Sequence, residues 1–305
     1  MIGITLGEHF GIGYEILAQS LSHLEQVPVI IYGDQHTFAQ TCQRLSISTP
    51  SLLRWHQIDC QAASKDQKEA RGQYVLDQLS QAMADAKQGI IEGLLTCPID
   101  KNIVRTVHPG FDGHTSYLQQ QTNSNYSIML MRNKDFAIVV GTQHIPLREV
   151  ARIFTQAYFE QLVHQTLDAF TRHFRQPAPR LAILGINPHA GEIDPEAEEK
   201  KWMQTSIQKL QAQGIQIQGP FPADSFFAKA RHQNWDAIIS PYHDQALIAA
   251  KYNGLADVVN ITLGLPFLRT SPGHGVAYDI AGQGKADASS FQTALNILIQ
   301  QSLSF

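Results

Sequence analysis

Three histidines occupy the same kind of position in this chain, just after a short apolar run. Such a run is typical of a buried strand, and α/β sheets place ligands at the carboxyl ends of their strands. Three neutral imidazoles with an open coordination position are what a catalytic divalent cation requires. The alternative for each histidine is a hydrogen bond that caps its own loop. The three residues are His144, His189 and His243, after the runs 136–140, 181–186 and 237–240.

A second group of side chains could bind a phosphate or a carboxylate. Lysine supplies a point charge, arginine a planar fork of donors, and threonine or asparagine a further hydrogen bond. Arg269 comes directly after the apolar turn 264–267, where an unpaired guanidinium would be costly. Taken singly, each member can also be a solvated or structural residue. The group consists of His114, Thr115, Lys251, Asn260 and Arg269.

The elements that would position these side chains alternate along the chain. The expected strands are 2–6, 29–32, 90–95, 136–140, 181–186, 237–240 and 258–263, and the expected helices are 12–22, 37–45, 67–87, 159–173, 195–213 and 291–300. The stretch 67–87 has the clearest helical period, with Val75, Leu79 and Met83 on one face. This alternation predicts an α/β fold with right-handed crossovers and a mostly parallel sheet covered by helices on both faces.

The composition excludes several classes of protein. Of the 305 residues, 43% are hydrophobic and 16% charged, which is enough for a core and predicts two domains or one large α/β unit. With 23 Lys and Arg against 27 Asp and Glu, the net charge of −4 argues against a nucleic-acid partner. No uncharged apolar run approaches the ~18 residues of a membrane span, so we expect no membrane partner. Three widely spaced cysteines without a C-x-x-C pair favour the reducing cytoplasm.

The common nucleotide-binding motifs are absent. Gly11 and Gly13 are followed by Ile16 where the Rossmann fingerprint needs a third glycine, and residues 282–285 lack the flanking residues of a Walker A loop. A nucleotide-dependent enzyme with this sequence would therefore need another fold.

Longer segments carry a more specific signal. They include Asn-Pro-His-Ala-Gly-Glu at 187–192, Tyr-His-Asp-Gln at 242–245 and the run 259–271, together with 7–13, 113–115, 142–148 and 219–224. In this order, across nearly the whole chain, the series resembles the 4-hydroxythreonine-4-phosphate dehydrogenase family of vitamin B6 biosynthesis. The segment 274–282 also resembles the cofactor loop of the isocitrate and isopropylmalate dehydrogenase superfamily. That likeness explains why the Rossmann glycines are missing.

The resemblance implies a fold, an assembly and a set of site residues. The fold is a two-lobed α/β/α subunit of the isocitrate/isopropylmalate dehydrogenase-like type, with a cleft between the lobes. We expect 1–125 and 262–305 to form the first lobe with the cofactor loop, and 126–261 to form the second with the metal ligands and the dimer interface. The assembly is a homodimer in which both subunits contribute to each active site. The implied residues are His144, His189 and His243 for one divalent metal ion, His114, Thr115, Lys251, Asn260 and Arg269 for the phosphorylated substrate, and His274, Gly275 and Asp279 for the cofactor.

The implied reaction is the oxidation of 4-phosphohydroxy-L-threonine by NAD or NADP, followed by decarboxylation of the 3-oxo acid to 3-amino-2-oxopropyl phosphate. The metal would lower the pKa of the alcohol so that a nearby base can take its proton. Asp244 and Asp224 are both candidates for that base or for a residue that orients a metal ligand. The ligand types are compatible with Zn, Co, Mn or Mg.

Some residues differ from the family pattern and leave other functions open. Phe10 and Tyr14 change the first loop, Asp100 stands where a histidine is usual, residues 193–196 replace a longer glycine-rich stretch, and Pro272-Gly273 precede His274 in place of an acidic residue. One alternative is a dehydrogenase of a related sugar-acid phosphate, such as 4-phospho-D-threonate or 4-phospho-D-erythronate. Others are a metal hydrolase that uses the same three histidines, and a non-catalytic binding protein.

Overall fold

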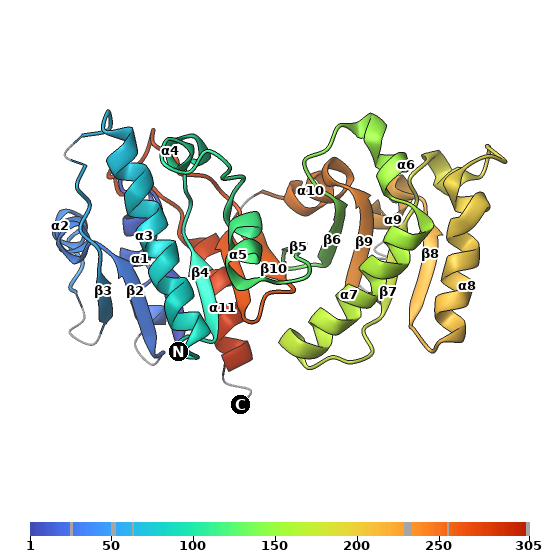
Figure 1. Ribbon diagram of the computed structural model, residues 1–305, viewed down its shortest axis with the longest axis horizontal. Helices are drawn as coiled ribbons and strands as arrows, with labels where there is room; N and C mark the ends of the chain where they lie inside the picture. Colours follow the sequence, from blue (N-terminus) through green and yellow to red (C-terminus); the bar gives the residue numbers. More distant parts are fainter. Residues whose placement is uncertain (25–26, 50–52, 63, 229–233, 255, 303–305) are drawn as a thin grey trace. The chain divides into compact units, whose positions relative to one another are not determined.

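The computed structural model describes residues 1–302 apart from 25–26, 50–52, 63, 229–233 and 255 (Figure 1). The chain forms two compact units. The first unit contains Met1–Ser127 and Leu255–Phe305, and the second contains Ile128–Gly254. Strand β10 (Val259–Leu263), which carries Asn260, therefore belongs to the first unit.

The first unit is built on strands in the order β3-β2-β1-β4-β11-β10. All neighbouring strands in this order are parallel except β10 and β11, which are antiparallel. The strands are β1 (Ile2–Thr5), β2 (Val29–Gly33), β3 (Arg54–Gln57), β4 (Gly93–Thr96), β10 (Val259–Leu263) and β11 (Leu268–Pro272).

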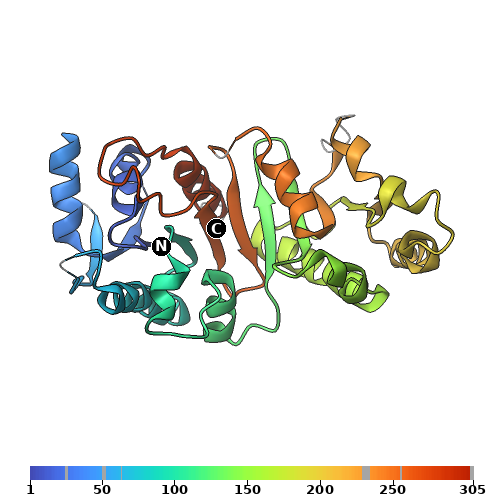
Figure 2. The same cartoon turned by 90° about the horizontal axis from the view of Figure 1, so that it is seen from above.

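Helices cover both faces of this sheet. The helices are α1 (Gly13–Ala18), α2 (Gln35–Leu45), α3 (Lys68–Lys87), α4 (Lys101–Arg105), α5 (His114–Thr122) and α11 (Ser289–Ser302), with a short 3-10 turn, η1 (Leu21–His23). Helices α3 and α5 lie on one face, and α1 and α11 on the other (Figure 2). The predicted apolar face of α3 is buried: Val75, Leu79 and Met83 pack with Tyr117 and Leu118 of α5 in one core cluster.

The second unit has strands in the order β5-β6-β9-β7-β8. β5 and β6 are antiparallel, and the other neighbours are parallel. The strands are β5 (Ile128–Arg132), β6 (Ala137–Thr142), β7 (Leu181–Leu184), β8 (Ile217–Phe221) and β9 (Ala237–Tyr242). The helical elements are η2 (Leu147–Glu149), α6 (Val150–Ile153), α7 (Gln156–Phe174), η3 (Pro188–Gly191), η4 (Glu199–Met203), α8 (Gln204–Ala212), α9 (Ala223–Ala228) and α10 (His243–Lys251).

The predicted α/β class with a mostly parallel sheet is confirmed. Four strands were not anticipated: β3, β5, β8 and β11. Their sequences are poor in the alternating or β-branched patterns that local analysis detects, since β8 contains Gly219 and Pro220, and β11 reads Leu-Arg-Thr-Ser-Pro. The expected turn at 264–267 is present between β10 and β11, and Arg269 follows it inside strand β11, all of whose residues are buried. Within the described ranges, no helix has both the length and the apolar character needed to cross a membrane.

Gly13, in the first turn of α1, permits a close approach between that helix and the end of β1. A Cβ atom on Gly13 would lie 2.0 Å from the carbonyl oxygen of Leu6. We expect Gly13→Ala to lower the free energy of unfolding by about 3 kcal/mol, because a backbone oxygen cannot rotate away. Urea denaturation measures the loss. Gly110→Ala is the matched control, because nothing lies within 4 Å of the added carbon; equal midpoints for both variants would contradict this account.

Candidate active site

A buried arginine is the centre of the first unit's polar site. Arg269 is 2% exposed and lies on β11 between β4 and β10. Its Nε donates to Thr96 Oγ1 at 3.0 Å, and its Nη1 donates to Thr262 Oγ1 at 3.1 Å. Within the part of the chain that the structure describes, no ion pair joins Arg269 to a carboxylate. Burial lowers the pKa of Arg269 to about 9, so the side chain is still a cation at neutral pH, with hydroxyl partners alone.

Three more of the predicted substrate residues lie in the same unit. Thr115 Oγ1 is 3.4 Å from Thr262 Oγ1, so it joins the hydroxyl group that contacts the guanidinium. His114 begins α5, and its Nε2 atom is buried without a hydrogen-bond partner among the described residues. The Oδ1 atom of Asn260 is also buried and has no such partner. The first unit thus holds an uncompensated cation and unpaired polar atoms, which together suit an anionic ligand.

Lys251, the fifth predicted substrate residue, ends helix α10 of the second unit. The structure describes it within that unit only, so its place beside the other four stays a prediction.

Sequence reasoning missed Lys101. This residue begins α4, which Asp100 caps by accepting a hydrogen bond from the backbone N–H of Asn102. A Cβ atom on Gly113 would lie 3.1 Å from Cε of Lys101, so the lysine side chain runs past the residue that precedes His114. Lys101 lies after the carboxyl end of the buried strand β4, but only the tertiary structure shows that its side chain meets Gly113. Lys101 adds a second positive charge beside Arg269 in the surroundings of His114.

His114 is held in its neutral form. Burial lowers its pKa well below the usual value of 6.5, and the positive charges of Arg269 and Lys101 lower it further. In the unfolded chain the imidazole takes up a proton near pH 6.5, whereas in the folded chain it does not. The His114 contribution to stability is therefore complete above pH 6.5 and is lost as the pH falls below it.

The lower pKa of His114 in the folded chain predicts that the free energy of unfolding depends on pH. Between pH 6.5 and 5.5 the free energy of unfolding should fall less steeply in His114→Gln than in the unchanged protein, by up to about 1.4 kcal/mol per pH unit. Urea denaturation at each pH measures both slopes. Parallel curves for the two proteins would show that His114 is not kept neutral in this way.

The histidines of the second unit are only partly brought together. β6 and β9 are neighbouring parallel strands, with Thr142 opposite Tyr242, so the residues that follow them lie side by side. The rings of His144 and His243 are 5.4 Å apart between centroids. His189 lies in η3, beyond β7 on the other side of β9. Among the described residues, no group of three His, Cys, Asp or Glu side chains is placed to hold a metal ion.

The backbone at these histidines is unusual. His144 has a φ of 48° and His189 a φ of 53°, in the left-handed region that non-glycine residues seldom adopt. Glu199, which sequence reasoning also missed, accepts hydrogen bonds from the backbone N–H groups of Ile186 and Asn187 at 2.7 and 2.8 Å. This buried carboxylate therefore holds the loop that carries His189. Backbone conformations of this kind cluster at functional sites.

The two candidate aspartates differ in their surroundings. Asp244 Oδ1 is 2.8 Å from Nδ1 of His243, the contact that orients an imidazole whose other nitrogen binds a metal. Asp224, on α9, lines a separate cavity of about 470 Å³ with Phe136, Phe227 and Tyr252. None of the three histidines lines that cavity.

The predicted cofactor segment follows β11 and contains neither helix nor strand over 273–288. It is held by hydrogen bonds to α1 and the loop before it. The buried carboxylate of Glu15 accepts from the backbone N–H groups of Gly282 and Ala286, each at 2.9 Å, and Ile12 donates to the carbonyl of Val276 at 3.2 Å.

The three predicted cofactor residues lie on this segment. The ring Nε2 of His274 is buried without a partner among the described residues, and burial lowers the pKa of this imidazole. Its Nδ1 is 3.1 Å from the carbonyl oxygen of Gly275, and Asp279 is exposed.

Comparison with known proteins places this geometry in a family. The family model described as "Pyridoxal phosphate biosynthetic protein PdxA" matches residues 14–298. A 4-hydroxythreonine-4-phosphate dehydrogenase of Paracoccus denitrificans is 37% identical, over 96% of this chain and 95% of the relative. The crystal structure of a 4-hydroxythreonine-4-phosphate dehydrogenase from Klebsiella pneumoniae superposes with a TM-score of 0.85 at 27% identity, over 99% of each chain.

A more distant likeness concerns the fold alone. Isocitrate dehydrogenase from Methylococcus capsulatus is 13% identical and has a TM-score of 0.51, over 98% of this chain and 84% of the other. The predicted isocitrate dehydrogenase-like fold is confirmed by this match. Because the family model covers most of the chain, the chain belongs to the PdxA family of pyridoxal phosphate biosynthetic proteins.

Proposed function

We propose that this protein is an NAD- or NADP-dependent, metal-assisted dehydrogenase of 4-phosphohydroxy-L-threonine. The 3-oxo acid that this oxidation forms would then lose CO2 to give 3-amino-2-oxopropyl phosphate. The observation that carries the proposal is Arg269, a buried cation whose hydrogen bonds go to the hydroxyls of Thr96 and Thr262. The relatives named 4-hydroxythreonine-4-phosphate dehydrogenase support the choice of substrate and reaction.

The first unit would bind the anionic substrate. Arg269 and Lys101 would supply positive charge, and Thr115 would supply a hydroxyl. Neutral His114 would donate or accept through Nε2, and Asn260 would accept through Oδ1. Both atoms are buried without a hydrogen-bond partner among the described residues. Lys251 would complete the set as a further cation.

The second unit would bind the metal. Imidazole nitrogens suit a divalent cation, and the 5.4 Å between the rings of His144 and His243 is compatible with two ligands on one ion. His189 is not grouped with these two histidines within one chain. We therefore propose that His189, the third ligand, is supplied by the second subunit of a homodimer, which completes each site. Asp244 would orient the His243 imidazole through Nδ1. Asp224, the other candidate for the base, lines a cavity that none of the three histidines lines.

A divalent metal lowers the pKa of an alcohol and polarises a carbonyl, while a nicotinamide accepts a hydride. The contribution of the chain is to hold the substrate anion by Arg269 and to keep His114 neutral beside it. His274, Gly275 and Asp279 would position the dinucleotide on the loop that Glu15 anchors. This division gives the first unit the cofactor contacts and the substrate contacts other than Lys251, and the second unit the metal contacts.

An absorbance assay tests the proposal. The purified protein is given 4-phosphohydroxy-L-threonine with NAD or NADP, before and after dialysis against a chelator. Reduction that stops on chelation and returns with Zn, Co, Mn or Mg is expected. Faster reduction with 4-phospho-D-threonate or 4-phospho-D-erythronate would reassign the substrate. Phosphate release without reduction would indicate a hydrolase, and no turnover of any of the three would overturn the proposal.

A further inference from the structure

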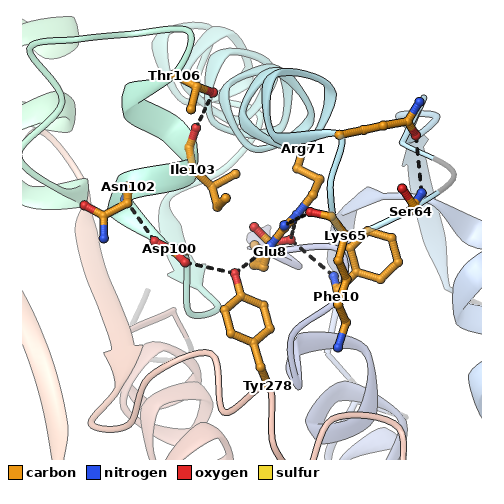
Figure 3. A network of polar contacts seen from close by, with 12 residues as sticks. Glu8, Phe10, Ser64, Lys65, Arg71, Asp100, Asn102, Ile103, Thr106 and Tyr278 are labelled. Carbon is orange, nitrogen blue, oxygen red and sulfur yellow. Dashed lines mark hydrogen bonds and ion pairs between the residues drawn. The ribbon is translucent and has the colours of Figure 1, made fainter.

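A polar network outside the substrate and metal residues connects the N-terminal loop to the proposed cofactor loop (Figure 3). Arg71, in the first turn of α3, is at its centre. Its Nε donates to Glu8 Oε1 at 2.9 Å, its Nη2 donates to the Tyr278 hydroxyl at 2.7 Å, and its Nη1 donates to the carbonyl of Lys65. Each of the three guanidinium nitrogens therefore donates to a group of the chain itself.

The Glu8–Arg71 ion pair at the centre of this network is buried. The side chains of Glu8 and Arg71 are 0% and 5% exposed. The Arg71 guanidinium also lies 5.4 Å from the ring centroid of Phe10 and 5.6 Å from that of Tyr278. Breaking a buried pair of this kind leaves a charge without a partner, which is far more costly than loss of a surface pair.

Tyr278 is the member that belongs to the cofactor loop. Its hydroxyl accepts from Arg71 and donates to Asp100 Oδ2 at 3.1 Å. The surrounding segment, 274–284, has no helix or strand of its own, so contacts with the rest of the unit determine its position. Figure 3 shows Tyr278 reaching from this loop to Asp100 and to the Glu8–Arg71 pair.

We infer that Arg71 and Tyr278 are positioning residues for the dinucleotide: together they fix loop 274–284 in the conformation that binds the cofactor. This inference rests on the proposed function, because that function assigns the loop to the dinucleotide. Arg71 and Tyr278 act through the loop and do not touch the reacting atoms. The carboxylate of Glu15 holds the other end of this loop at Gly282 and also binds the N–H of Ala286 just beyond it.

The test is Tyr278→Phe, which keeps the ring beside Arg71 and removes the hydroxyl. We expect the Kd and KM for the dinucleotide to rise about 10-fold, since a hydrogen bond to a charged group is lost. The KM for the phosphorylated substrate and kcat at saturating dinucleotide should stay unchanged. Hydrogen–deuterium exchange of 274–284, without any cofactor, should be faster in the variant.

Tyr32→Phe is the matched control. It removes a tyrosine hydroxyl that donates to a carboxylate of the same unit, Asp85 Oδ2, at 2.7 Å, and Tyr32 packs in the core cluster with Val75 and Leu79. The control should leave dinucleotide affinity and loop exchange unchanged. Arg71→Lys, which keeps the charge but not the fork of donors, should behave as Tyr278→Phe does.

The outcomes separate the two proposals. If the unchanged protein binds neither NAD nor NADP in calorimetry, the proposed function fails, and loop exchange by itself decides whether the network holds the loop. If the unchanged protein binds the dinucleotide, but Tyr278→Phe matches it in affinity or in exchange, the inference is wrong. Equal losses in Tyr278→Phe and Tyr32→Phe would also overturn it, because they would indicate general destabilisation.

Discussion

Arg269→Ala is expected to raise the KM for the phosphorylated substrate about 30-fold or more, the effect of removing one member of a buried charge pair. In the free protein the guanidinium is 2% exposed and is hydrogen-bonded to threonine hydroxyls, so a bound anion is its natural counter-charge. Steady-state kinetics with varied substrate and saturating dinucleotide measures the change. Calorimetric titration with inorganic phosphate provides a second measurement that does not depend on turnover.

Two further variants keep this prediction falsifiable. Arg105→Ala removes an arginine of the same unit that pairs with Asp112 at 3.2 Å and whose side chain is 43% exposed, so we expect an unchanged KM. Arg269→Lys retains the charge but not the planar fork of donors, and it should lose less affinity than the alanine variant. An unchanged KM in a folded Arg269→Ala protein would remove Arg269 from the substrate site.

His243→Ala is expected to lower kcat/KM about 100-fold or more and to remove the bound metal ion. His243 is the histidine with two supporting contacts, since its ring is next to that of His144 and its Nδ1 is 2.8 Å from Asp244. Loss of this imidazole would therefore remove a proposed metal ligand and the group that Asp244 contacts. Elemental analysis of the purified protein and the dinucleotide-reduction assay measure the two effects.

His164→Ala is the matched control for this experiment. His164 is an exposed residue of α7 in the same unit and should affect neither metal content nor rate. Asp244→Asn tests the orienting role and should lower metal affinity about 10-fold to 100-fold. A His243→Ala protein with full metal content, or a rate that is insensitive to chelator, would refute the metal assignment.

Much of the fold could be predicted because its signals are local. The period of Val75, Leu79 and Met83 along one helix face depends on neighbours three and four residues away, and these side chains do form the core with α5. The β-branched runs that become β1, β2, β6, β7 and β9 are recognisable in the same way. Strands such as β8 and β11 could not be recognised, because these segments become strands only through pairing with distant strands.

The candidate site shows the same limit. His144 and His243 could be selected from the sequence because each follows an apolar run, but nothing local indicates that β6 and β9 are neighbours whereas His189 lies beyond β7. Lys101 and Glu199 were missed because their roles depend on where Gly113 and Asn187 lie in space. The spacing of residues along the chain selects side-chain types, but strand order decides which of them meet.

The sequence by itself determined the α/β class, the family and the types of side chain available for chemistry: imidazoles for a metal, and cations with hydroxyls for an anion. Only the tertiary structure decided the environment of Arg269. Insertion of β11 between β4 and β10 brings Thr96, 173 residues away in the chain, to the guanidinium and excludes solvent from it. The physical reason is that local periodicity specifies helices and strands, whereas burial and charge compensation depend on pairings between distant segments.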